Sequence, residues 1–151
     1  MSLPFFYEDF DIAETLVLSD ANMHYMMHVL RMKLGEQCWI TNGKGTRGLA
    51  TITSTSKKTC TVYVSEVLET DMPKAHLHLA IAFTKNPSRI EWLLEKATEI
   101  GIATITPLIT HRSEKLHWKK DRYEKILISA MLQSQQTFLP KLNDAIPLKE
   151  V

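Results

Sequence analysis

Carboxylates and histidines are the side chains whose spacing in this sequence could support chemistry. Glu91, Glu95 and Glu99 recur at the spacing of one helix face, and paired carboxylates can act as general acid and base. A solvated helix face is the simpler interpretation of Glu91 and Glu95. His76 and His78 alternate along an expected strand and therefore face the same side. No further ligand types lie near them in the sequence, so we expect no metal site.

Positive charge is concentrated in one part of the chain. The net charge of the 151 residues is only +1, but between residues 31 and 58 one acidic residue, Glu36, accompanies several basic ones. These are Arg31, Lys33, Lys44, Arg47, Lys57 and Lys58. A local positive potential can bind nucleic-acid phosphates, and a solvated strand face is the alternative interpretation.

The common catalytic and nucleotide-binding motifs do not occur. The Asn-Gly-Lys-Gly segment at 42–45 lacks the spacing of a phosphate-binding loop, and we interpret it as a hairpin turn. The sequence has no serine nucleophile elbow, no catalytic cysteine arrangement and no dinucleotide-binding glycine motif. Residue chemistry alone therefore indicates a two-domain protein that could bind RNA.

The composition is that of an ordinary globular protein, with 44% hydrophobic and 23% charged residues. No run is apolar enough to cross a bilayer, and the first residues lack the features of a signal peptide. Cys38 and Cys60 lie far apart in strand-like segments, which favours two reduced, buried thiols over a disulfide or zinc site. We therefore expect a cytoplasmic protein without membrane or metal partners.

Residues 1–70 show mostly β patterns with one short helix. A helix is expected to begin after Ser19 or Asp20, acting as N-cap, and to end near Leu30. Strands are expected at 16–18, 38–41, 49–53 and 60–64. Short strands at this spacing suggest a small β-barrel.

A linker candidate at 71–74 separates this region from a second domain, residues 74–151. Asn86 is the expected N-cap of a helix that starts at Pro87 and ends before Gly101. Strands are expected at 76–83 and 102–106, with a further helix at about 119–136. The fold class is therefore α/β, with a small barrel followed by a parallel sheet. Because few strands follow, we expect the second domain to be incomplete.

Four segments resemble signatures of one protein family, in family order and with family-like spacing. They are Val29–Glu36 (VLR-x-x-x-G), Lys96–Ile102 (K-A-T-E-L-G-V), His111–Ser113 (E-R-S) and Gln133–Pro140 (Q-S-x-R-x-x-x-P). On these residues the sequence resembles the ribosomal RNA small subunit methyltransferase E family, over nearly the whole chain.

The resemblance implies an N-terminal PUA-like RNA-binding barrel and a C-terminal SPOUT domain with a deep trefoil knot. It implies methylation of N3 of a uridine in the 16S ribosomal RNA of the 30S subunit. The methyl donor would be S-adenosylmethionine and the assembly a homodimer. The alternative is a non-catalytic RNA-binding module, for which a barrel and a basic segment suffice.

The sequence departs from the family pattern at three points. Tyr25, next to His24, stands where the family usually has a histidine, and Gln136 stands at the arginine of Q-S-x-R. The glycine-rich G-P-E-G-G loop and the L-G-x-x-I-L-R-x-E-T-A segment, which hold the cofactor in the family, do not occur. We therefore expect a truncated form that is inactive by itself and binds no S-adenosylmethionine.

The same motifs supply the candidate site residues. Arg112 is expected to be catalytic in the intact enzyme, because it follows a strand's carboxyl end and matches the arginine of E-R-S. A guanidinium stays protonated, so its role would be to grip an RNA phosphate or orient the target base. A surface arginine is the alternative. The RNA-binding candidates are Arg31, Lys33, Arg47 and His24, and the motif residues with a structural role are Lys96, Glu99, Gly101 and Gln133.

Overall fold

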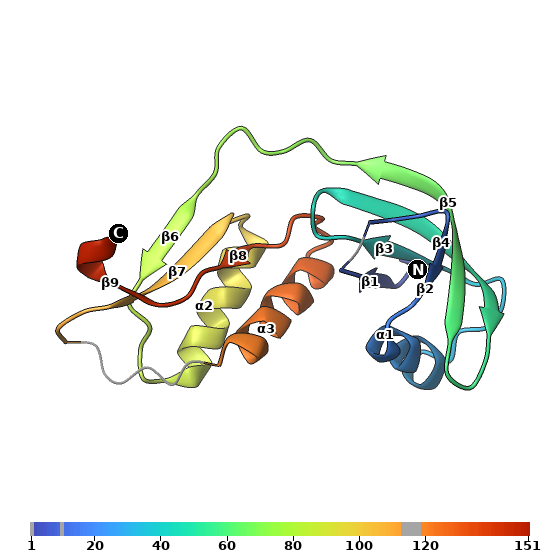
Figure 1. The fold of residues 1–151 in the computed structure, drawn as a ribbon, viewed down its shortest axis with the longest axis horizontal. Coiled ribbons are helices and arrows are strands. Elements are labelled where there is room, and N and C mark those ends of the chain that lie inside the picture. The colour runs from blue at the N-terminus through green and yellow to red at the C-terminus, as the bar shows by residue number, and fades with distance from the viewer. Residues whose placement is uncertain (1, 10, 113–118) are drawn as a thin grey trace. The chain divides into compact units, whose positions relative to one another are not determined.

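Two units make up the chain, Met1–Met72 and Pro73–Val151, in a computed structural model that describes residues 2–9, 11–112 and 119–151 (Figure 1). Among these residues, none of the helices has the length and apolarity needed to cross a membrane.

The first unit is built on a five-stranded sheet in the order β1-β3-β4-β5-β2. Its strands are β1 (Phe5–Tyr7), β2 (Thr15–Val17), β3 (Gln37–Thr41), β4 (Thr46–Thr55) and β5 (Cys60–Glu69). Neighbours in this order pair antiparallel, except that β1 runs parallel to β3. The strands predicted after residue 15 are confirmed, although β4 and β5 are longer than expected, and β1 was not predicted.

One helical segment packs on this sheet. It begins as α1 (Asp20–His24), capped by Ser19, and continues as the π-helical turn η1 (Tyr25–Val29). Met26 in η1 is fully buried, and the strands contribute Cys38, Ile40, Ala50, Ile52, Cys60 and Val62 to the same core. The predicted N-cap is confirmed, whereas the π-helical second half was not expected.

A buried carboxylate attaches the start of this helix to the sheet. Glu8, which follows β1, is 3% exposed. Its Oε1 accepts hydrogen bonds from the backbone N–H of Ser19 (2.9 Å), the Ser19 hydroxyl (3.2 Å) and Asn22 Nδ2 (2.9 Å). The three donors replace the water that a buried carboxylate loses.

The second unit is a parallel sheet with two helices packed against it. Its elements are β6 (His78–Ile81), α2 (Pro87–Glu99), β7 (Thr104–Ile109), α3 (Lys120–Gln133), β8 (Lys141–Leu142), β9 (Ile146–Pro147) and the 3₁₀ turn η2 (Leu148–Glu150). β7 pairs with β6, β8 and β9, always in parallel. Figure 1 shows α2 and α3 side by side, and Leu94 of α2 and Leu127 of α3 share one buried cluster with Ile105 of β7.

The predicted ends of α2 are confirmed. The Asn86 side chain accepts from the backbone N–H of Ser88 at 2.9 Å, and Pro87 occupies the first helical position. Gly101 follows the helix with φ +90°, a value that glycine adopts without steric cost. The chain therefore turns at Gly101 and enters β7 after a short connection.

Candidate functional site

Arg31 ends the helical segment of the first unit in a left-handed backbone conformation, with φ +53°. The N–H of Leu30 donates to the carbonyl of Tyr25 (2.9 Å), and that of Met32 donates to the carbonyl of Met26 (3.0 Å). Both methionines are buried, so these bonds hold the Arg31 backbone in place while its side chain stays exposed. A non-glycine residue in this conformation costs about 1–2 kcal/mol, and such strain is often kept at functional positions.

The segment that follows Arg31 is fixed to the sheet, and Lys33 projects from it. The backbone N–H of Lys33 donates to Glu36 Oε2 at 2.6 Å, and Gly35 N donates to the Ile52 carbonyl of β4 at 2.9 Å. Lys33 itself is exposed. The structure therefore presents Arg31 and Lys33 on one ordered loop.

Two histidines stand before this loop. His24 and His28 are exposed, with ring centroids 4.9 Å apart. Tyr25, the departure from the family pattern, packs against Phe6 in an edge-to-face arrangement with ring centroids 6.2 Å apart. His28 was not singled out in the sequence, although its four-residue spacing from His24 is the available signal.

Arg47 lies apart from these residues. It pairs with Thr41 at the turn end of the β3–β4 hairpin, whereas the Arg31–Glu36 loop bonds to Ile52 at the other end. Its guanidinium carbon lies 4.6 Å from the centre of the Trp39 ring, a cation–π arrangement. The predicted RNA-binding residues therefore form two groups on the first unit.

In the second unit, the K-A-T-E-I-G residues serve the end of α2. Lys96 Nζ lies 3.2 Å from Glu99 Oε2 and 3.3 Å from Glu95 Oε1, and hydrogen bonds to Glu99 and then Glu95 raise the pKa of Lys96. Gln136 Nε2 donates to the Glu99 carbonyl at 2.8 Å, so this departure from the family pattern has a helix-capping role. Gln133 is exposed at the end of α3.

Arg112 is exposed and lies three residues beyond Ile109, the last residue of β7. Ser113, which completes the three-residue motif with His111 and Arg112, lies outside the described residues. Arg112 therefore follows the carboxyl end of a parallel strand, as the sequence predicts.

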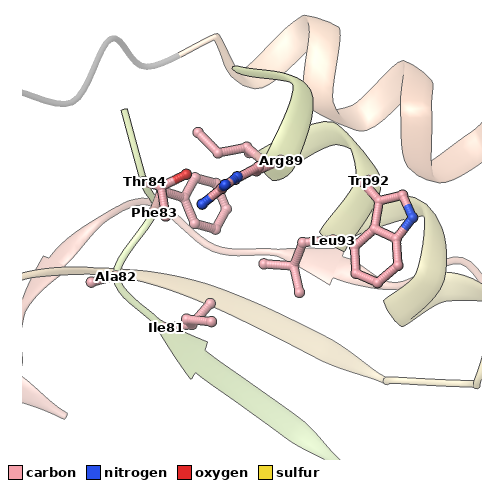
Figure 2. A pocket seen from close by; sticks show the side chains of 8 residues that line it. Ile81, Ala82, Phe83, Thr84, Arg89, Trp92 and Leu93 are labelled. Atoms are coloured by element: carbon pink, nitrogen blue, oxygen red, sulfur yellow. The ribbon is translucent and has the colours of Figure 1, made fainter. Parts of the chain in front are cut away.

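A pocket lies at the carboxyl end of β6, beside the start of α2 (Figure 2). Its volume is about 380 Å³. It is lined by Ile81, Ala82, Phe83, Thr84, Arg89, Ile90, Trp92 and Leu93. None of these residues was a candidate from the sequence, because a tryptophan within a helical pattern is indistinguishable from a core residue there.

Polar side chains also meet on the strands of the second unit. Thr106 of β7, 2% exposed, shares its hydroxyl with His78 Nε2 (2.6 Å) and Asn143 Nδ2 (2.9 Å). This network joins β6, β7 and the residue after β8. Within the described part of the chain, no group of three or more histidine, cysteine or acidic side chains could hold a metal ion.

Two family models match the chain. One, described as an RNA methyltransferase PUA domain, matches residues 18–64, and the other, described as an RNA methyltransferase domain, matches residues 70–151. Proteins named ribosomal RNA small subunit methyltransferase E are similar in sequence. The one from Buchnera aphidicola subsp. Acyrthosiphon pisum is 33% identical over 145 residues, covering 89% of this chain and 56% of the relative. The one from Rickettsia conorii is 31% identical, covering 87% and 54%.

Solved structures give the same picture. A probable rRNA-methyltransferase from Porphyromonas gingivalis aligns with a TM-score of 0.89 at 35% identity, covering 97% of this chain and 62% of that chain. A ribosomal RNA small subunit methyltransferase E from Neisseria gonorrhoeae, bound to S-adenosyl methionine, aligns with a TM-score of 0.87 at 26% identity, covering 98% and 63%. The chain spans about half the length of the curated relatives that it matches.

Proposed function

The chain belongs to the RNA methyltransferase family whose domain model spans residues 70–151, and we propose that it provides the RNA-binding unit and part of the catalytic unit of a 16S ribosomal RNA methyltransferase. It combines a PUA-like domain with a SPOUT-like parallel sheet. The proposed reaction is methylation of N3 of a uridine in the 30S subunit. S-adenosylmethionine is the proposed methyl donor, and a homodimer is the proposed assembly. The two free, buried cysteines support a cytoplasmic location.

We infer that the residues described by the structure, 2–9, 11–112 and 119–151, do not form a site for S-adenosylmethionine by themselves. The second unit has a single glycine, Gly101, which ends α2, so it offers no glycine-rich loop that could cradle the cofactor. The pocket beside β6 has no acidic residue among its lining side chains to match the cofactor's sulfonium and ammonium charges. This supports the proposal that the chain alone transfers no methyl group.

The conformation of Arg31 is the observation that carries the RNA-binding proposal. An exposed arginine is held in a strained backbone conformation, next to the exposed Lys33, in the most basic segment of the chain. A guanidinium suits a bidentate contact with phosphate. Arg31 and Lys33 are therefore the proposed phosphate contacts of the first unit, with His24 beside them and Arg47 in a second group.

Binding of a 16S ribosomal RNA fragment at several salt concentrations tests this proposal. Arg31→Ala and Lys33→Ala should each weaken binding and lower the slope of log affinity against log salt by about 1. Lys125→Ala, which removes an exposed charge of the same sign from outside the basic segment, is the matched control and should leave affinity and slope unchanged. Unchanged affinity and slope for both Arg31→Ala and Lys33→Ala would refute the assignment.

Methyl transfer tests the catalytic part of the proposal and the role of Arg112. The assay needs an enzyme that also carries the cofactor-binding segments of the family, 30S subunits lacking the modification, and mass spectrometry of the nucleosides. N3-methyluridine should form, and Arg112→Lys should reduce the rate by about tenfold or more, because charge is kept while the bidentate fork is lost. Near-normal turnover of Arg112→Lys would show that Arg112 is a surface arginine without a catalytic role. RNA binding without any methyl transfer would favour the non-catalytic alternative.

A further inference from the structure

We propose that the pocket beside β6 holds one unpaired RNA nucleobase, stacked on the Trp92 indole, with Arg89 gripping an adjoining phosphate. The inference rests on the proposed function, because it takes RNA as the ligand. It adds a base-binding site in the second unit to the phosphate contacts proposed for the first.

The size and walls of the pocket suit a nucleobase. Its volume of about 380 Å³ is within the range of small-molecule sites. Figure 2 shows Ile81, Ala82, Phe83 and Thr84 coming from β6 and the loop after it, and Leu93 coming from α2. Most of these side chains are apolar, so they suit the flat face of a nucleobase better than the charged sugar–phosphate backbone of RNA.

Trp92 is the second feature of the site. It is 62% exposed, although Ile90 and Leu94 of the same helix are buried in the core. Leaving a large aromatic ring in water at the edge of a pocket forfeits the burial that stabilises most tryptophans. Stacking of an unpaired base on such a ring is a general mode of single-stranded RNA recognition.

Arg89 supplies charge that fits a phosphate. It is exposed, and no ion pair to it is found within residues 2–9, 11–112 and 119–151. Three other cations of α2 and α3 have acidic partners: Lys96 pairs with Glu95 and Glu99, Lys120 with Asp144, and Arg122 with Glu91. The guanidinium of Arg89 is therefore available to an anion, and its positive charge disfavours a cationic ligand such as S-adenosylmethionine.

The location of the pocket agrees with this use. Ligands of parallel α/β sheets bind beyond the carboxyl ends of the strands, and the pocket begins at Ile81, the last residue of β6. A base must leave its stack before an enzyme can modify it. A pocket that holds one extruded base, either the uridine to be methylated or a nucleotide next to it, therefore serves the proposed reaction.

The experiment is RNA binding by the 151-residue chain, with a single-stranded, uridine-rich oligonucleotide as the probe. Trp92→Ala should weaken binding about fivefold or more, and Trp92→Phe, which keeps an aromatic face, should retain most of the affinity. Arg89→Ala should lower the salt slope by about 1, and Arg89→Lys should keep the slope. Ile100→Ala and Lys125→Ala are matched controls, because both residues are exposed in the same unit and neither lines the pocket. Circular dichroism confirms that each variant is folded.

Photo-crosslinking identifies the contact directly. An oligonucleotide carrying 5-iodouridine should crosslink to Trp92 or Phe83, as located by mass spectrometry. The proposal is overturned if the unchanged chain binds no RNA, if Trp92→Ala and Arg89→Ala both bind as tightly as the unchanged chain, or if crosslinks fall only outside the pocket. The proposal is also overturned if the unchanged chain binds S-adenosylmethionine and Trp92→Ala does not, because the pocket would then be the cofactor site. If these crosslinks form but an enzyme that also carries the family's cofactor-binding segments methylates no 30S subunits, the proposed reaction is wrong and the pocket assignment stands.

Discussion

At the scale of single residues, Arg31 and Gly35 are two left-handed positions in one short loop, with φ +53° and +85°. Glycine at position 35 carries no steric penalty, whereas arginine at position 31 does. A side chain retained despite this penalty is expected to serve binding rather than folding. The two positions therefore allow stability and binding to be separated by substitution.

Arg31→Gly should raise the free energy of unfolding, or leave it unchanged, while RNA binding weakens. Relief of the left-handed strain contributes about 1–2 kcal/mol, and the greater freedom of glycine in the unfolded chain offsets part of it. Gly35→Ala is the control with the opposite sign. No heavy atom lies within 4 Å of the added Cβ, so its cost of about 1 kcal/mol comes from the backbone alone. Urea unfolding measures both, and a loss of more than about 1 kcal/mol in Arg31→Gly would make the arginine structural.

At the scale of elements, β4 packs closely against β5 at Gly48, the one glycine within β4. A Cβ added to Gly48 would lie 2.5 Å from Cγ1 of Val64, and the register of the two strands shifts between Leu49 and Ala50. Val64 is buried and branched, so it cannot turn aside easily. This contact leaves no room for a side chain at position 48 of β4, the strand that also carries Arg47.

Gly48→Ala should destabilise the first unit by about 1–3 kcal/mol, because the new methyl group overpacks the core. Val64→Ala removes the clashing methyl groups, so the double variant should lose less stability than the two single variants combined. A coupling of at least about 0.5 kcal/mol in a double-mutant cycle is expected from urea unfolding. If the stability losses of the two single variants simply add in the double variant, the strands separate to accept the methyl group.

The sequence predicts elements whose signals are local and misses those that depend on distant partners. Asn86, Pro87 and Gly101 mark both ends of α2 because each acts on the backbone within its own helix turn. β1 has three residues and no such signal, since its pairing with β3 joins segments about thirty residues apart in the sequence. The π-helical turn η1 keeps helical spacing, so apolar periodicity does not distinguish it from an α-helix.

The candidate site divides in the same way. Arg31 was found through its charge and its place in the VLR motif, and Gly101 through the backbone conformation that glycine favours at a helix end. The pocket was missed, because it arises where Arg89 and Trp92 of α2 meet residues that follow β6. The exposure of Trp92 follows from this tertiary arrangement and not from its helical spacing.

At the scale of the whole molecule, each unit has its own core. One cluster is built around Met26, Ile40 and Ile52, and the other around Leu94, Ile105 and Leu127. A separate core is the usual requirement for a domain to fold alone. We expect the first unit to need nothing from the second for its fold.

A fragment of residues 1–72 should therefore unfold cooperatively, with a urea midpoint close to that of the same unit in the full chain. Limited proteolysis of the full chain should cut near residues 71–74 and leave a stable N-terminal product. Circular dichroism and the fragment's RNA affinity provide the measurements. A fragment that is unfolded, or a chain that never yields such a product, would show that the units depend on each other.

Labelling of the two buried thiols, Cys38 and Cys60, can measure how fast the first unit opens. Burial, with a smaller contribution from Cys60, raises the pKa of Cys38 to about 12, and burial also raises the pKa of Cys60. Both side chains are inaccessible, and the second unit contains no cysteine. A maleimide reacts with thiolate, so at pH 8 it should label the native chain only as fast as the first unit opens. The labelling half-life then reports the opening of the first unit alone, whatever the second is doing, and labelling of the native chain at the rate of the denatured chain would contradict this burial.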